Sequence, residues 1–170
     1  MGFFDKLTGT KHPEAGVARR PAEELRKALL ALNGPDVPYV IGDGSAHGAD
    51  LVAEWRFAEP AWQHVFVQSQ LTHALRIRMR LAEDVPEVRA VQEQWEVTRV
   101  GNPPRLKTSA TYRRGGGRTI SRRYTLQRGE SGRLEATEDF SLDSAQLTDP
   151  LRNTALRSAW TWRAVIFGKL

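Results

Sequence analysis

The chain has 170 residues, of which 40% are apolar and 26% charged, and its formal net charge is +5. This length and balance are typical of one well-packed domain and exclude an intrinsically disordered chain. The absence of cysteine excludes disulfides, thiolate nucleophiles, and zinc or iron–sulfur sites built on cysteine.

The cellular location is expected to be the cytoplasm. No apolar run is long enough to span a bilayer. The first residues lack the basic region, apolar stretch and cleavage site of a secretory signal.

The positive charge is concentrated in one segment. Between Arg99 and Arg133 the chain has ten lysines and arginines and a single carboxylate, Glu130, so the remainder is net acidic. Such a division is typical of an anion-binding surface, but also of a basic hairpin packed against an acidic neighbour in the same fold.

The N-terminal part is predicted to be an arm followed by a helix. Glycines and a proline interrupt residues 1–18, which are expected to form a flexible arm, with a single domain over residues 19–170. Pro21 suits a first helical position and Gly34 a helix end. Leu25, Leu29 and Leu32 recur at helical spacing, which predicts a core-packing helix.

The middle of the chain has the pattern of successive strands. Strands are expected over residues 38–41, 51–57, 70–83 and 91–97, with a helical turn or wide loop over 60–66. The clearest signal lies in residues 75–81, where leucine, isoleucine and methionine alternate with three arginines. This period of two predicts an antiparallel sheet with one apolar face and one charged face.

The C-terminal half is expected to begin with a hairpin. Residues 106–112 and 119–126 flank three glycines, a strong hairpin signal, and a last strand follows over 134–142 after a turn at 129–132. Asp149 and Pro150 are typical of a helix start, and the final helix is predicted to run to Gly168 with two tryptophans on its apolar face.

This order predicts an α+β fold. A curved antiparallel sheet of about seven strands would pack on the C-terminal helix, with the extra N-terminal helix beside it. Two architectures fit, a pleckstrin-homology-like barrel and a helix-grip sheet with an internal cavity.

Residues 49–55, residues 87–91 with 95–97, and the ending 160–170 carry a family resemblance. Together they resemble a family of uncharacterised bacterial proteins, over about Tyr39 to the C-terminus. The resemblance implies a bacterial, cytoplasmic protein, and it transfers no activity, ligand or catalytic residue.

The glycine-rich loop over residues 42–50 is the most enzyme-like feature. Asp43, His47 and Asp50 are suitable ligands for a hard cation, which gives the hypothesis of a metal-dependent enzyme. The loop lacks the order of a P-loop and no helix pattern follows it, so a plain hairpin loop is the favoured interpretation.

Charged residues on the predicted strands have two interpretations. Glu54, Glu93 and Glu96 are candidates for acid–base chemistry in a cavity. The favoured interpretation is cross-strand ion pairs with arginines that are similarly placed, namely Arg56, Arg76, Arg78, Arg80 and Arg99.

The expected basic hairpin, residues 112–124, is the most partner-like feature. Its arginines are flanked by tyrosines, a composition that suits nucleic acid or an anionic surface, although a solvated or self-paired surface is favoured. The candidate binding residues are Arg113, Arg114, Arg118, Arg122, Arg123 and, beside a groove between sheet and last helix, Trp160.

The sequence therefore favours a non-enzymatic domain that binds a ligand or protein partner through that groove or the hairpin. Nonspecific binding of nucleic acid or of an anionic surface is the alternative, and a metal enzyme the second. No catalytic residue, metal site or cofactor is predicted, and a homodimer is left open.

Overall fold

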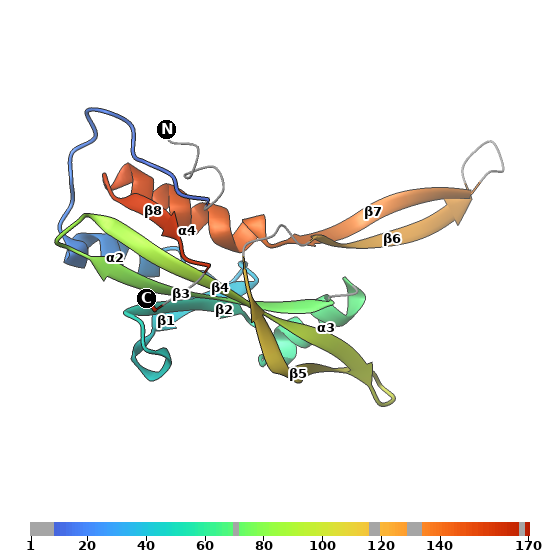
Figure 1. Cartoon of the computed structure of the whole chain (residues 1–170). Helices are drawn as coiled ribbons and strands as arrows, with labels where there is room; N and C mark the ends of the chain where they lie inside the picture. The colour runs from blue at the N-terminus through green and yellow to red at the C-terminus, as the bar shows by residue number, and fades with distance from the viewer. Residues whose placement is uncertain (1–8, 70–71, 116–119, 129–133, 167–168) are drawn as a thin grey trace.

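A computed structural model describes residues 9–69, 72–115, 120–128, 134–166 and 169–170 (Figure 1). Three α-helices lie in these residues, together with a short 3₁₀ helix at Ser45–His47, and none of the α-helices is long and apolar enough to cross a membrane. The elements are α2 (Ala22–Leu30), β1 (Tyr39–Asp43), β2 (Leu51–Trp55), α3 (Pro60–Gln68), β3 (His73–Ala82), β4 (Glu87–Val100), β5 (Arg105–Arg114), β6 (Ile120–Arg128), β7 (Leu134–Asp143), α4 (Ala145–Arg157) and β8 (Thr161–Ala164).

The α+β expectation is confirmed, but the described strands form two sheets instead of one sheet of about seven. The main sheet is antiparallel in the order β1-β2-β3-β4-β5, and β8 adds to β4 in parallel. Strands β6 and β7 pair with each other as a two-stranded ribbon that extends away from the main sheet (Figure 1). The predicted turn at 129–132 lies outside the described residues.

Strand β3 has the two faces that its alternation predicts. Leu75, Ile77 and Met79 are buried on one face, whereas Arg76 and Arg78 lie half-buried on the other. The antiparallel registers place Ala53 of β2 opposite Ile77 and Ala90 of β4 opposite Met79 on the first face. Glu54 and Glu93 lie opposite Arg76 on the second face. The sheet therefore has an apolar face that packs against helices and a face rich in arginine.

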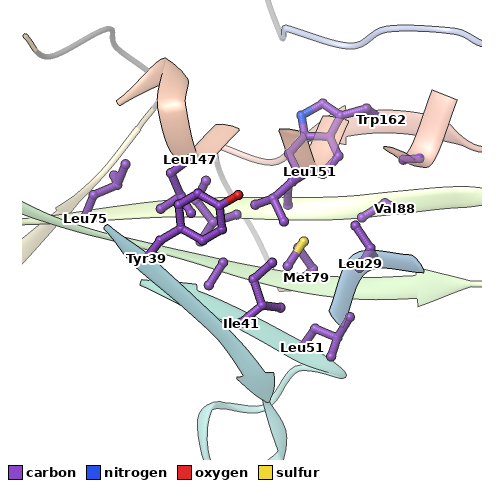
Figure 2. Packing of buried hydrophobic residues seen from close by; sticks show 14 of the residues in the cluster. Leu29, Tyr39, Ile41, Leu51, Leu75, Met79, Val88, Leu147, Leu151 and Trp162 are labelled. Atoms are coloured by element: carbon purple, nitrogen blue, oxygen red, sulfur yellow. The ribbon is translucent and has the colours of Figure 1, made fainter. Parts of the chain in front are cut away.

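Helices α2 and α4 cover the apolar face of the sheet. Leu147, Leu151 and Ala155 on α4 are fully buried, and Leu25 and Leu29 of α2 join the same cluster. Figure 2 shows Leu29, Leu147 and Leu151 packed among side chains of β1–β4. The space between the sheet and the last helix, predicted as a binding groove, is thus packed with core side chains.

The final helix differs from its prediction at both ends. It begins at Ala145, where the Asp143 carboxylate accepts a hydrogen bond from the Ala145 N–H at 2.9 Å, so Pro150 lies inside it. It ends at Arg157, because Ala159 takes a left-handed φ of 58°. The backbone N–H of Trp160 then donates to the Ala155 carbonyl. The chain continues as strand β8, whereas the helix was predicted to run to Gly168.

The first helix and the arm also have definite places. Helix α2 begins after Pro21 and ends at Leu30, inside the predicted span. The described part of the arm lies along β8, where Lys11 and Trp162 exchange two backbone hydrogen bonds of 2.8 Å. Residues 1–8 lie outside the description.

The core makes a stability prediction. We expect Leu151→Ala to lower the free energy of unfolding by about 2–5 kcal/mol, because it leaves a cavity beneath α4. Urea unfolding followed by tryptophan fluorescence measures the loss. Val85→Ala, at a side chain that is 57% exposed, is the control and should change stability by less than about 0.5 kcal/mol. Equal midpoints for the two variants would contradict this packing.

Candidate binding surface

The arginines of β3 are engaged within the protein. Arg76 Nε lies 2.9 Å from Glu54 Oε2, and Arg78 Nε lies 2.8 Å from Glu93 Oε1. Each pair joins neighbouring strands, which confirms the prediction of cross-strand ion pairs. The remaining strand arginines of that prediction bond backbone carbonyls: Arg56 those of Tyr39 and Gly34, Arg80 that of Gly48, and Arg99 that of Val67.

The glycine-rich loop is the connection of the β1–β2 hairpin, as its favoured interpretation predicted. The Asp43 carboxylate accepts hydrogen bonds from the Ser45 hydroxyl and backbone N–H, which lower the pKa of that carboxyl below its usual value, with Arg26 adding to the effect. Asp50 Oδ2 accepts from the Leu81 N–H at 2.8 Å, and the His47 carbonyl accepts from Arg78. These contacts give the loop residues roles in holding the hairpin against β3. Within the described ranges, no three or more His, Asp or Glu side chains are placed to hold a metal ion.

Glu87 is a buried carboxylate that sequence reasoning missed. Its two oxygens accept from Arg89 Nε at 2.6 Å and Arg163 Nε at 2.7 Å, so it joins β4 to β8. Burial raises the pKa of Glu87, but the hydrogen bonds and charges of the two guanidinium groups outweigh it and leave the pKa below its usual value. The pairing with Arg163 depends on strand β8, whereas the sequence pattern predicts a helix over these residues.

Trp160 is a core residue in the structure. It is 1% exposed, and its indole N–H donates to the Arg20 carbonyl at 2.8 Å. Trp95 differs, because it lies half-buried on the arginine-rich face. Its ring is 5.3 Å from that of Tyr112, and the Arg76 guanidinium lies 4.8 Å from its centroid.

The predicted basic hairpin does not form as one unit. Arg113 and Arg114 lie on β5, which pairs with β4, whereas Arg122 and Arg123 lie on β6, which pairs with β7. Arg118 lies outside the described residues. The charge pattern gives a physical reason, because β5 and β6 carry only positive charge and like charges on paired strands repel. Strand β7, which pairs with β6, instead has four acidic residues in its sequence: Glu135, Glu138, Asp139 and Asp143.

At two outer edges of the main sheet, one residue of the edge strand is bonded to another part of the chain. At β1 the Asn33 side chain donates to the Ile41 carbonyl and accepts from its N–H, both at 2.8 Å, as a neighbouring strand would. At β8 the backbone of Lys11 does the same for Trp162. Both contacts satisfy backbone groups on edge strands that would otherwise be open to other chains.

Strand β5 forms the third edge. Across the described residues it pairs with β4 alone. Of its ten residues, Leu106 alone is buried. The strand carries Arg105, Lys107, Arg113 and Arg114 and no carboxylate. Arg113 is 4.0 Å from Glu96, and since both side chains are well exposed this pair adds little stability. We call β5 the basic edge.

No family model, curated protein or solved structure matches the chain.

The Glu87 site gives a pH prediction. Because its folded-state pKa is lowered from 4.5, its contribution to stability is present above that value and is lost as the pH falls through the folded-state pKa. We expect Glu87→Gln to cost about 1.5–3 kcal/mol at neutral pH, the usual range for hydrogen bonds to a charged group. The cost should shrink at about pH 3, which urea unfolding at both pH values measures.

The exposed carboxylate Glu83 supplies the control. Glu83→Gln should leave stability within about 0.5 kcal/mol of the parent protein at neutral pH. A loss for Glu87→Gln that is the same at both pH values would contradict the ionic role of Glu87.

Proposed function

We propose that the protein is a non-enzymatic, cytoplasmic binding domain that takes up an acidic, extended protein segment along the basic edge. The single observation that carries the proposal is the contrast among the outer edges of the main sheet. Asn33 and Lys11 each bond one residue of the edge strands β1 and β8, whereas β5 pairs with β4 alone across the described residues. Backbone groups along such an edge can add a further strand.

Charge makes this edge selective. Four cations over ten residues repel a second basic strand, so two copies of β5 are disfavoured as partners. A strand that carries carboxylates gains cross-strand attraction of about 0.2–1 kcal/mol for each opposed pair. The expected partner segment is therefore acidic and able to extend.

The architecture that we propose is the helix-grip arrangement, one of the two expected from the sequence. Helix α4 packs across the apolar face of the sheet through buried leucines, and this packing supports the proposal. Binding at the basic edge needs no internal cavity. The partner strand would pair with the outer edge of β5, which lies on the opposite side of β4 from β3.

A labelled peptide tests the proposed function. A peptide as long as β5, in which Glu and Val alternate, should bind and raise fluorescence anisotropy, whereas a Lys–Val peptide should not. Lys107→Glu/Arg113→Glu should weaken binding about tenfold or more, because it reverses two charges of the edge. A Glu–Val peptide N-methylated at alternate residues should also lose binding, since strand addition needs its N–H donors.

The matched control is Lys27→Glu/Lys169→Glu, which reverses two exposed lysines that lie outside β5. It should bind the Glu–Val peptide as the parent protein does. Equal binding of the N-methylated peptide, or an equal loss in the control, would reject strand addition at β5.

Single-stranded nucleic acid is the second candidate, favoured by the corner where Trp95, Tyr112 and Arg76 meet. Tyr112 is 45% exposed and contacts the Trp95 ring, an arrangement on which bases can stack. If the corner binds a labelled oligonucleotide, Tyr112→Ala should weaken binding about tenfold, Tyr112→Phe should not, and affinity should fall steeply with salt. Equal affinity of the three proteins would reject this site.

A further inference from the structure

The β6–β7 ribbon is a segment of this chain that lacks a described strand partner. Each of its strands pairs with the other alone across the described residues, and Figure 1 shows the ribbon extending away from the main sheet. An isolated two-stranded ribbon is marginally stable in water, and a third strand stabilises it. Pairing with a further strand would therefore stabilise the ribbon, and the basic edge is a strand that can provide such pairing.

The two open strands match in length and in charge. Strands β5 and β7 each have ten residues. Strand β5 carries four cations and no carboxylate, and β7 carries four carboxylates and no cation. Strand β6, with three arginines and no carboxylate, is disfavoured as the partner of β5.

Antiparallel pairing in full register brings opposite charges together. Counted along the sequence with Arg105 opposite Asp143, the cation Arg113 stands opposite Glu135, and Lys107 stands diagonal to Asp139. In their existing pairs, β5 has a register shift between Thr108 and Tyr112, and β7 has one at Asp139. Directly opposed and diagonal residues are the two kinds of neighbour that interact across strands. The parallel arrangement in full register opposes a single such pair, Arg114 with Asp143.

We propose that the acidic segment taken up by the basic edge is β7 of a second copy of this chain. Two copies exchange their ribbons, so that β7 of each pairs antiparallel with β5 of the other. This inference rests on the proposed function, because it names the partner of the same edge. It assigns the ribbon a role in forming a symmetric dimer.

Sedimentation velocity at low salt tests the exchange, with variants that carry paired charge reversals. The parent protein should sediment as a dimer, with twice its mass of 19.1 kDa. Lys107→Glu/Arg113→Glu reduces the positive charge of β5. Glu135→Lys/Asp139→Lys reduces the negative charge of β7. Each variant alone should dimerise about tenfold more weakly, because its β5 no longer attracts β7 of another copy.

Mixing the two variants should restore a dimer, since each reversed strand then faces a complementary one in the other protein. The Lys27→Glu/Lys169→Glu variant is the matched control and should dimerise as the parent does. A monomeric parent protein, or a mixture that stays monomeric while each variant remains folded by circular dichroism, would overturn the exchange. A parent-like dimer of either variant alone would also overturn it.

The Glu–Val peptide separates this inference from the proposed function. We expect it to bind the Glu135→Lys/Asp139→Lys variant, whose own β7 no longer competes for β5. Peptide binding by a monomeric parent protein would overturn the exchange and leave the basic edge as a site for another acidic partner. A dimer that dissociates in the β5 variant but lacks peptide binding would reject the outside partner and support the exchange.

Discussion

Strand β4 imposes the constraint on which the rest of the architecture depends. One edge of this strand pairs with β3 along most of its length, and the other is divided between two strands. Strand β8 occupies Glu87–Ala90, and β5 occupies the part from Glu93 onward. Because the two strands meet near Gln92, β5 cannot extend further and the chain leaves the sheet at Gly115, whose φ of 146° suits glycine. Because the chain leaves the main sheet at Gly115, strands β6 and β7 form a separate ribbon.

The short parallel strand β8 is held at this shared edge by more than its four backbone pairs. Glu87 on β4 binds Arg89 and Arg163, and the arm backbone closes the far side of β8 through Lys11. Trp160 and Trp162 add buried area to the core beneath α4. The C-terminal strand therefore depends on charge pairing and burial together, and its presence limits how far β5 can extend along β4.

The sequence predicted what local periodicity determines. The alternation in β3 and the loop between β1 and β2 are local features. The ion pairs of Arg76 and Arg78 were predicted only as cross-strand pairs in general, and the strand registers provide the partners Glu54 and Glu93. The end of α4 depends on the pairing of Trp162 with Lys11 and Val88, which are far apart in sequence. The prediction of a β5–β6 hairpin was wrong. Glycines at 115–117 permit a chain reversal, but the charges of the strands and the length of β4 edge that is available determine which strands pair.

Charge order along the chain links the fold to the proposed binding. Strand β5 is basic, β6 is basic and β7 is acidic, so the adjacent strands β5 and β6 repel while β6 and β7 attract. Repulsion keeps the ribbon from folding back as a third strand beside β5, and it leaves β5 as the basic edge. In the proposed binding, the cations of β5 would disfavour pairing with β5 of another copy and favour an acidic strand, so the charges that oppose aggregation would also select the partner.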